Sequence, residues 1–253
     1  MRLKGLNAIV TGATSGFGKA IAILFAKEGA NVAVVGRNGE RGEEVVRLIE
    51  ENGGRAFFSQ TDVTVDESVK NMVESVIDRF GHIDILINNA GVVVKGAAPD
   101  LSPEEWERSW QTNVTSVYLV SHYVLPHMLK RKCGVIVNMG STAGIKGFKD
   151  RVAYCAAKFA VVGMTKAMAV DHSKDGVRVN CICPGAVETE AIKSMIENSP
   201  DPEQTRNMLL SRRLTPCLGT IEEIAEAVLF LALPQNRYLT GAILNFDGGT
   251  SAM

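Results

Sequence analysis

Residues 7–18 read Asn-Ala-Ile-Val-Thr-Gly-Ala-Thr-Ser-Gly-Phe-Gly, and this stretch decides the fold. Its first four residues favour a buried β-strand, and the helical pattern of Lys19–Lys27 follows directly. A glycine-rich turn between a strand and a helix is typical of folds that bind a pyrophosphate through helix amide groups. Here Gly12 would permit the tight turn, Gly16 would admit the anion to the backbone, and Gly18 would let the helix pack closely.

The spacing of these glycines is looser than the most familiar pattern for such a turn. Three residues separate Gly12 from Gly16, whereas GxGxxG has one residue between its first two glycines. A glycine-rich turn that opens an ordinary helix is therefore the alternative interpretation. Residues further along the chain are needed to distinguish a pyrophosphate-binding turn from a turn that opens an ordinary helix.

Short apolar runs alternate with longer segments of helical period along the chain. This alternation predicts an α/β fold, a doubly wound Rossmann-type domain with a seven-stranded parallel sheet and helices on both faces. The expected strands are Ala8–Val10, Val32–Val35, Ala56–Phe58, Ile83–Ile87, Val135–Val137, Val177–Ile182 and Ala242–Asn245. Thr64, Ser102 and Thr220 each precede an acidic residue by three positions, which predicts three helix starts.

Length and composition are those of one globular domain. The chain has 253 residues, of which 46% are hydrophobic and 22% charged, so we expect residues 1–253 to share one core. A polar break from about Glu188 to Thr220 falls inside the last crossover. We expect residues 190–215 within it to form a lid over the ligand.

Charge and composition argue against several classes of partner. A formal net charge of −1, with dispersed basic residues, predicts no nucleic-acid partner and no attraction to an anionic membrane. No apolar stretch approaches the roughly 18 residues that span a bilayer, and a strand-like run close to Met1 leaves no room for a secretory signal, so we expect a cytoplasmic protein. The cysteines form no CxxC pair and the histidines lack ligand spacing, so no metal site is predicted.

The end of the second expected strand bears on the choice of dinucleotide. Many folds that bind NAD(H) place a carboxylate there, which bonds the ribose hydroxyls. This chain has Gly36 followed by Arg37, whose planar guanidinium suits the 2′-phosphate of NADP(H). NADP(H) is therefore favoured, while NAD(H) stays possible because Gly36 excludes neither. A solvated Arg37 at a helix start is the alternative interpretation.

A tyrosine and a lysine lie one turn apart in the expected helix Val152–Lys174. The spacing Tyr154-x-x-x-Lys158 places both side chains on one face. A phenol has an ordinary pKa near 10, but a neighbouring ammonium and a positive nicotinamide ring both favour the phenolate. Ser141 follows the strand Val135–Val137 at its carboxyl end, where open α/β sheets bind ligands, and its hydroxyl could hold a substrate oxygen.

Together these motifs resemble the short-chain dehydrogenase/reductase family, including its 3-oxoacyl-carrier-protein reductase and carbonyl reductase-like members. The resemblance runs from about Lys4 to Asp247-Gly248-Gly249. The motifs that carry it, in the family's order and at its usual intervals, are TGxxxGxG (Thr11–Gly18), Asn88-Asn89-Ala90-Gly91, Asn113, Ser141, Tyr154-x-x-x-Lys158 and Pro184-Gly185.

The resemblance implies hydride transfer between a nicotinamide cofactor and an alcohol or carbonyl compound. It implies that Ser141, Tyr154 and Lys158 form a catalytic triad in which Tyr154 donates or accepts the proton. Asn113 would hold a water that links Lys158 to solvent. The implied cofactor-binding residues are Gly12, Thr14, Ser15, Gly16, Phe17, Gly18, Arg37, Asp62, Val63, Asn89, Ala90, Gly91, Tyr154, Lys158, Pro184, Gly185, Val187 and Thr189.

Some of these positions have narrower implied roles. Asp62 and Val63 resemble the pair that meets the adenine, and Thr189 resembles the threonine that contacts the nicotinamide amide or the pyrophosphate. Ser15 stands where many NADP-dependent relatives carry a basic residue, so Arg37 would act nearly alone on the 2′-phosphate.

The motifs leave the substrate open. Residues 92–99, 142–151 and 190–215 should surround it, and the lid mixes apolar with basic side chains. A 3-oxoacyl thioester, a hydroxysteroid and a sugar all remain candidates. Arg151 is close enough to Tyr154 in sequence to bind an anionic group, although an exposed cation at a helix start is the alternative.

The resemblance also implies a homotetramer or homodimer, with Ile224–Leu233 and Ala242–Phe246 supplying an interface. A non-catalytic dinucleotide sensor or scaffold is the rival function. It is disfavoured because such a protein has little reason to retain all four catalytic residues.

Overall fold

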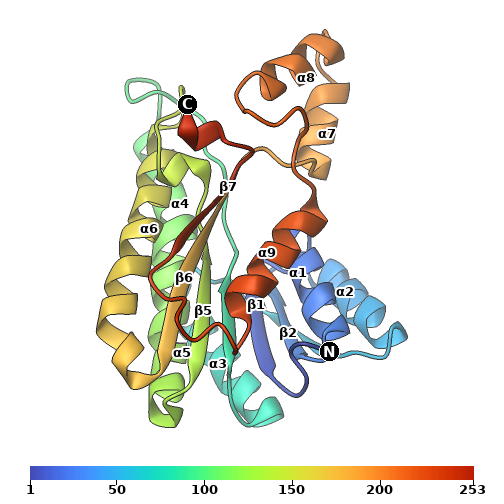
Figure 1. Ribbon diagram of the computed structural model, residues 1–253, viewed down its shortest axis with the longest axis vertical. Coiled ribbons are helices and arrows are strands. Elements are labelled where there is room, and N and C mark those ends of the chain that lie inside the picture. Colours follow the sequence, from blue (N-terminus) through green and yellow to red (C-terminus); the bar gives the residue numbers. More distant parts are fainter.

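One parallel sheet of seven strands runs through the molecule (Figure 1). The computed structural model describes the backbone of residues 1–253 and every side chain except that of Ala191. The strand order is β3-β2-β1-β4-β5-β6-β7, and neighbouring strands are parallel, as predicted. The strands are β1 (Asn7–Thr11), β2 (Asn31–Gly36), β3 (Arg55–Gln60), β4 (Ile85–Asn88), β5 (Gly134–Met139), β6 (Val177–Pro184) and β7 (Ile243–Phe246).

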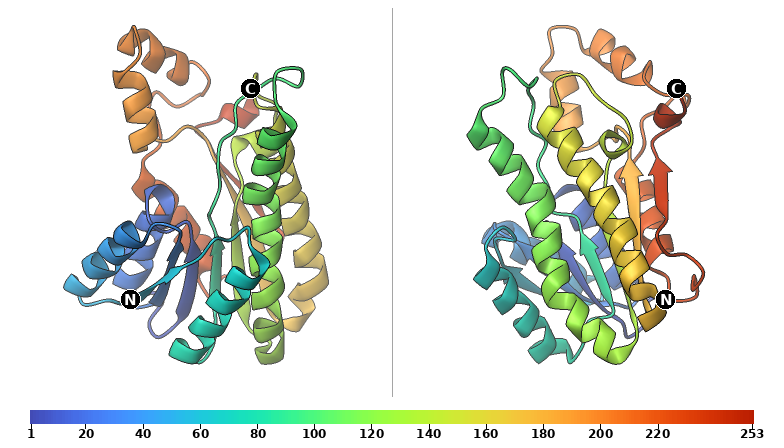
Figure 2. Two further views of the ribbon diagram at one scale, coloured as in Figure 1. Left: turned by 180° about the vertical axis from the view of Figure 1, so that it is seen from behind. Right: turned by 90° about the vertical axis from the view of Figure 1, so that its left-hand side faces the viewer.

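Helices cover both faces of the sheet, which confirms the doubly wound architecture (Figure 2). One face carries α1 (Gly16–Lys27), α2 (Gly39–Glu51) and α9 (Ile221–Ala232). The other carries α3 (Asp66–Phe80), α4 (Pro103–Trp110), α5 (Ser116–Arg131) and α6 (Val152–His172). Two further helices, α7 (Glu190–Glu197) and α8 (Pro202–Leu210), stand beyond the carboxyl edge of the sheet.

Strand β1 shows how one strand serves both layers. Ala8 and Val10 belong to the apolar cluster formed with α1, α2 and α9, whereas Ile9 belongs to the cluster with α3 and α5. All three side chains are fully buried. A strand covered on both faces needs apolar residues at every position, which is why β1 reads as a continuous apolar run.

The strand order reverses between β1 and β4. The chain leaves β1 toward one side of the sheet and leaves β4 toward the other, so the loops diverge and open a crevice at the carboxyl ends. The glycine-rich turn after β1, the loop after β4 and Ser141 after β5 all lie along this edge. The fold therefore gathers the predicted motifs at one place.

A helix begins close to each of the three predicted starts, but only two of the three capping hydroxyls are confirmed. Ser102 accepts a backbone hydrogen bond at the start of α4, and Thr220 takes part in a capping box at the start of α9. Thr64 does not cap α3, whose N-cap is Val65. The Thr64 hydroxyl instead donates to Asp62 Oδ1 at 2.7 Å.

The segment predicted as a lid folds mainly into α7 and α8. Both of its ends are attached to the body of the protein. Before α7, Val187 pairs with Gly219 in a short parallel bridge. After α8, the amide groups of Leu214 and Thr215 donate to the Gly248 carbonyl at 2.8 and 3.1 Å.

Helix α6 bears on the expectation that no apolar stretch of this chain is long enough to span a bilayer. By length and composition alone, the helical run Val152–Asp175 could cross a membrane, with a mean hydropathy of 1.2 over 18 residues. A core helix passes the same test, and α6 packs against β6. Only 33% of the apolar window is buried, and Phe159 and Val170 are exposed on the outer face. The apolar residues of α6 thus lie on two faces of the helix, and the sheet covers one of these faces.

A chain of polar side chains joins the sheet to α5 and α6. Asn88 Nδ2 donates to Asn138 Oδ1 (2.9 Å) and to Ser121 Oγ (3.1 Å), and Asn138 Nδ2 donates to Thr165 Oγ1 (3.0 Å). None of the four residues exposes more than 3% of its surface. Because buried amides are costly to leave unpaired, this chain fixes α6 relative to β5.

Thr165→Val should lower the free energy of unfolding by roughly 1–3 kcal/mol, because valine keeps the volume of threonine but leaves Asn138 Nδ2 without its acceptor. Thr165→Ser keeps the acceptor and loses one methyl group, which should cost about 1 kcal/mol. Urea unfolding of both variants measures the difference. A larger loss in the serine variant would show that packing, and not the hydrogen bond, matters at this position.

Candidate active site

The glycine-rich turn has the geometry that its sequence predicts. Gly12 has a φ of 63°, and a Cβ there would lie 2.9 Å from Ala90 Cα. A Cβ on Gly18 would collide with the Gly12 carbonyl oxygen, so α1 packs against the turn only because the side chain is absent. Ser15, the N-cap of α1, makes no side-chain capping bond. The first amide groups of α1 therefore remain available to an anion.

A cavity of about 460 Å³, here called the Arg37 cavity, opens beside this turn. Its walls come from the ends of β1, β2, β3 and β4 and from the starts of α1 and α2. Its lining residues are Gly12, Thr14, Ser15, Phe17, Gly36, Arg37, Asn38, Arg41, Thr61, Asp62, Val63, Thr64, Asn89, Ala90, Gly91 and Thr112.

Two polar residues of this cavity are already engaged by the protein. Asp62 Oδ1 accepts bonds from the Thr64 amide (2.9 Å) and hydroxyl (2.7 Å), and these bonds hold the pKa of the carboxyl below its ordinary value. Asn89 Nδ2 donates to the carbonyls of Thr11 (2.8 Å) and Gly12 (3.2 Å). Both side chains are thus held in fixed orientations at the cavity wall.

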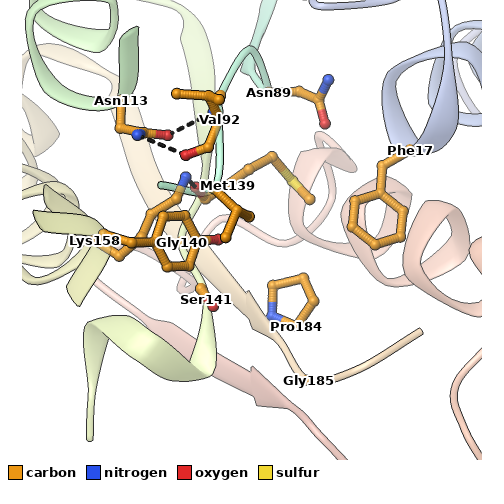
Figure 3. A pocket seen from close by; sticks show the side chains of 13 residues that line it. Phe17, Asn89, Val92, Asn113, Met139, Gly140, Ser141, Lys158, Pro184 and Gly185 are labelled. Carbon is orange, nitrogen blue, oxygen red and sulfur yellow. Dashed lines mark hydrogen bonds between the residues drawn. The ribbon is translucent and has the colours of Figure 1, made fainter. Parts of the chain in front are cut away.

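A second cavity of about 190 Å³, here called the Ser141 cavity, adjoins the first (Figure 3). Phe17, Asn89 and Gly91 line both cavities. The other lining residues of the Ser141 cavity are Val92, Val93, Asn113, Met139, Gly140, Ser141, Tyr154, Lys158, Pro184 and Gly185. The structure therefore brings the four predicted catalytic residues to one cavity.

Ser141, Tyr154 and Lys158 come from two elements that meet at this cavity. Ser141 lies in the loop after β5, and its Oγ accepts a bond from Ala143 N at 3.1 Å, which fixes the hydroxyl oxygen. Tyr154 and Lys158 lie one turn apart on α6, and Lys158 Nζ is 5.8 Å from the centre of the Tyr154 ring. Lys158 Nζ donates to the Met139 carbonyl at 2.7 Å, which ties α6 to the end of β5.

Asn113 lies in a single π-helical turn, Gln111–Thr115, between α4 and α5. Such turns occur often at functional sites. Asn113 Oδ1 accepts from Val92 N (3.0 Å) and Nδ2 donates to Val92 O (2.9 Å), as Figure 3 shows. The fully buried amide thereby holds the loop after β4. A Cβ on Gly91 would lie 2.8 Å from Asn113 Oδ1 and 3.6 Å from Lys158 Nζ, so Gly91 leaves room between them.

Burial shifts the protonation of both titratable groups. Burial raises the pKa of Tyr154, and its hydrogen bond with Ser141 acts in the opposite direction. Burial also lowers the pKa of Lys158 to about 8. In the nucleotide-free protein the phenol is therefore protonated at neutral pH. The expectation that a neighbouring ammonium and a positive nicotinamide ring together favour the phenolate stays a prediction, because it concerns the protein with its nucleotide bound.

Four predicted cofactor residues lie outside the walls of both cavities: Gly16, Gly18, Val187 and Thr189. Open space surrounds the position that a Gly16 side chain would take, and Gly18 packs against the turn. Val187 is buried, and Thr189 Oγ1 caps α7 by accepting from Ile192 N at 3.3 Å. A contact of Thr189 with the nucleotide stays a prediction.

Arg41 lines the Arg37 cavity but is not among the residues predicted from the sequence. The Asn38 side chain caps α2 by accepting from Arg41 N at 2.9 Å, which brings the first turn of α2 to the cavity. The signal for this placement exists in the sequence, because an asparagine directly after Arg37 is a common N-cap. Two guanidinium groups therefore flank the cavity instead of one.

Arg213 is a second unpredicted residue, and it connects the lid to the site. Its guanidinium is buried and donates to the Leu209 carbonyl at 2.6 Å and to the Ala186 carbonyl at 3.2 Å. This joins the end of α8 to the loop that carries Gly185 in the wall of the Ser141 cavity. The sequence does not distinguish Arg213 from its exposed neighbour Arg212.

Comparison with known proteins agrees with this geometry. A family model described as short chain dehydrogenase matches residues 6–200. An uncharacterized oxidoreductase of Thermotoga maritima is 40% identical over the full length of both chains. A 3-oxoacyl-[acyl-carrier-protein] reductase of Chlamydia trachomatis is 37% identical over 96% of each chain. The crystal structure of a levodione reductase superposes with a TM-score of 0.94 at 29% identity, covering 99% of each chain.

Lys158→Met should raise the free energy of unfolding of the nucleotide-free protein at pH 7 by roughly 2 kcal/mol. The substitution removes an amino group whose protonated, charged form is disfavoured by burial. The pKa of this lysine is about 8 in the folded chain against an ordinary 10.5, so the folded state binds fewer protons across that interval. The free energy of unfolding of the wild type should therefore rise between pH 8 and 10.5. The amount by which it falls below that of the variant should shrink over the same range.

Urea unfolding of both proteins across this pH range measures the effect. Lys166→Met, which changes an exposed lysine on the same helix, is the control and should show no such dependence on pH. A deficit that stays constant from pH 7 to 10.5 would contradict the burial of a charged Lys158.

Proposed function

The chain belongs to the short-chain dehydrogenase/reductase family, and on that premise we propose that it transfers a hydride between NADP(H) and an alcohol or carbonyl compound. The family is one of oxidoreductases that use a nicotinamide dinucleotide. The observation that carries the proposal is the shared wall between two cavities. One contains Ser141, Tyr154 and Lys158, and the other lies beside the uncapped start of α1.

The residues present suit a bound dinucleotide. The uncapped amide groups of α1 would bind the pyrophosphate, Asp62 and Val63 would meet the adenine, and Lys158 would bind the nicotinamide ribose. Phe17 lies at the junction of the two cavities, where the nicotinamide half would pass. When bound, the nicotinamide supplies or accepts the hydride and with it the electron pair.

The proton would move through the side chains of the Ser141 cavity. In the reducing direction Tyr154 gives its hydroxyl proton to the carbonyl oxygen as the carbon gains the hydride, while Ser141 donates a hydrogen bond to that oxygen. The Lys158 ammonium stabilises the phenolate that remains, and a water held at Asn113 would return the proton. The raised pKa of Tyr154 suits this acid role. In the oxidising direction the same steps run backwards.

A preference for NADP(H) over NAD(H) is supported by charge and by space. Arg37 and Arg41 both line the cavity that would hold the adenosine half, and a 2′-phosphate needs such cations. A Cβ at Gly36 would lie 2.6 Å from Thr14 Cγ2, so Thr14 leaves no room for a carboxylate side chain at position 36 itself, and the residue that meets the ribose would be Arg37.

The substrate is an alcohol or carbonyl compound small enough at its reactive end to enter the Ser141 cavity. A 3-oxoacyl thioester, a hydroxysteroid and a sugar remain the candidate classes. We propose that residues 1–253 form one domain in which 190–215 act as a lid. We also propose a homotetramer or homodimer, because α9 leaves Phe230 and α6 leaves Phe159 about half exposed. The α6 surface extends the interface expected from the sequence.

Tyr154→Phe should abolish turnover, lowering kcat by roughly 10³-fold or more, because it removes the proton that the carbonyl oxygen needs. The affinity for the nucleotide should stay nearly unchanged, since the ring remains in place. Absorbance at 340 nm measures turnover, and nicotinamide fluorescence measures binding. Persistent activity in the variant would refute the mechanism, whereas a wild type that binds nucleotide but reduces no carbonyl would favour the sensor alternative.

Arg37→Asp should reverse the cofactor preference. The variant should bind NADPH roughly tenfold or more weakly than the wild type does, and it should bind NADH at least as well as the wild type does. The carboxylate repels the 2′-phosphate and can bond the ribose hydroxyls. Arg47→Asp removes a cation from α2, the helix that follows Arg37, but away from the cavity, so the cofactor preference of this variant should match that of the wild type. Fluorescence titration with both nucleotides measures the ratio. Unchanged NADPH affinity in Arg37→Asp would overturn the assignment.

A further inference from the structure

Arg151 is a cation close to Tyr154, although it is not among the residues that line the Ser141 cavity. It is the N-cap of α6, one turn before Tyr154, and residues three apart on a helix are neighbours. Among the side chains that the structure describes, no carboxylate oxygen lies within 4.0 Å of its nitrogens. Its Nη1 donates only to the carbonyl of the preceding residue, Asp150, at 2.6 Å.

The backbone ties Arg151 to the loop that follows β4. Gly96 and Arg151 form an isolated parallel bridge, in which Gly96 N donates to Asp150 O (3.0 Å) and Val152 N donates to Gly96 O (3.3 Å). Gly96 belongs to the loop whose Val92 lines the cavity. Asp150 has a φ of 55°, a left-handed conformation that is uncommon for a residue with a side chain. Such conformations gather at functional sites, where the surrounding structure enforces them.

The local charge is positive although the whole chain is slightly negative. Residues 92–99 and 142–151 contain Lys95, Lys146, Lys149 and Arg151 against one acidic residue, Asp150. Lys146 is occupied, because its Nζ donates to the Thr250 and Met253 carbonyls at 3.0 and 3.2 Å. The charge of Arg151 also acts on the Tyr154 hydroxyl, where it opposes the rise in pKa caused by burial. Of these four cations, Arg151 is therefore the best placed to reach a molecule bound at Tyr154.

We propose that Arg151 binds an oxyanion carried by the substrate, so that the carbonyl compound reduced at Tyr154 is anionic. This inference rests on the proposed function and narrows its substrate class. The remaining N–H groups of the guanidinium can form a bidentate pair with a carboxylate or a phosphate. The anion would have to lie a few bonds from the reacting carbon, because Arg151 and Tyr154 are only one helical turn apart.

The test compares pairs of carbonyl compounds that differ in charge. The acids are 3-oxobutanoate, 4-oxopentanoate and 5-oxohexanoate, each with its methyl ester, and a further pair is 3-oxobutanoyl-coenzyme A with the uncharged N-acetylcysteamine thioester. At least one acid should exceed its methyl ester in kcat/KM by roughly tenfold, mainly through KM. Such a preference identifies a carboxylate. A preference confined to the coenzyme A pair would contradict the inference, because the phosphates of coenzyme A lie at the far end of the pantetheine arm and not a few bonds from the reacting carbon.

Variants at Arg151 decide whether this residue causes the preference. Arg151→Gln should bring the anionic-to-neutral ratio close to one, and Arg151→Lys should keep part of it. Lys174→Gln, which removes a cation beyond the opposite end of α6, should keep the full ratio. A ratio near one in the wild type would overturn the inference. So would a loss in Arg151→Gln that is equal for acids and esters, because that pattern indicates a structural role.

Failure of this inference is distinguishable from failure of the proposed function. If the esters are reduced and Tyr154→Phe abolishes that reduction, the proposed function holds even when charge has no effect. If no carbonyl compound of either charge is reduced with either nucleotide, the proposed function itself fails.

Discussion

Side-chain hydrogen bonds join the end of β1 to the loop after β4, at the point where the strand order of the sheet reverses. Both cavities depend on these bonds. Thr11 Oγ1 accepts from the amides of Asn89 (2.9 Å) and Ala90 (3.0 Å), and Asn89 Nδ2 returns bonds to the carbonyls of Thr11 and Gly12. Strand pairing between β1 and β4 has ended at this level, since their last paired residues are Val10 and Ile87. Without these bonds the backbone groups at the crevice would lack partners, and its floor would not be fixed.

Much of the fold and of the candidate site is predictable because the signals are local. Each of the seven apolar runs overlaps a strand, and the spacing of Tyr154 and Lys158 on a helix determines that they share a face. Convergence of Ser141 with them follows from a general property of parallel sheets, whose strands all end at one edge. None of these predictions requires knowledge of long-range side-chain contacts.

What could not be predicted depends on contacts between segments far apart in the chain. Arg213 is a lid residue by its sequence, yet its carbonyl partners are Leu209 in α8 and Ala186 in the loop after β6, and only the packed structure buries it. Thr64 has the pattern of a helix cap but bonds to Asp62, because the loop after β3 turns the hydroxyl away from α3. Burial also raises the pKa of Tyr154, and burial is a tertiary property that the spacing of Tyr154 and Lys158 does not reveal.

The candidate site also costs the fold part of its stability. A buried ammonium at Lys158 is less favourable than a buried methyl group, and its one protein acceptor is the Met139 carbonyl. The surrounding sheet offsets this cost through its two continuous apolar layers. A bound nucleotide with ribose hydroxyls near Lys158 would add acceptors and so relieve part of the penalty.

The attachment of the lid at both ends has a consequence for how this protein could diversify. Val187 pairs with Gly219 before α7, and Leu214 and Thr215 bind Gly248 after α8, so the two helices form a loop closed at its base. Segments between such fixed points can be lengthened, shortened or replaced with little entropic cost to the rest of the chain. The helical insert is thus a replaceable module. A constant candidate site at the carboxyl edge of the sheet could in this way be combined with many different covering segments.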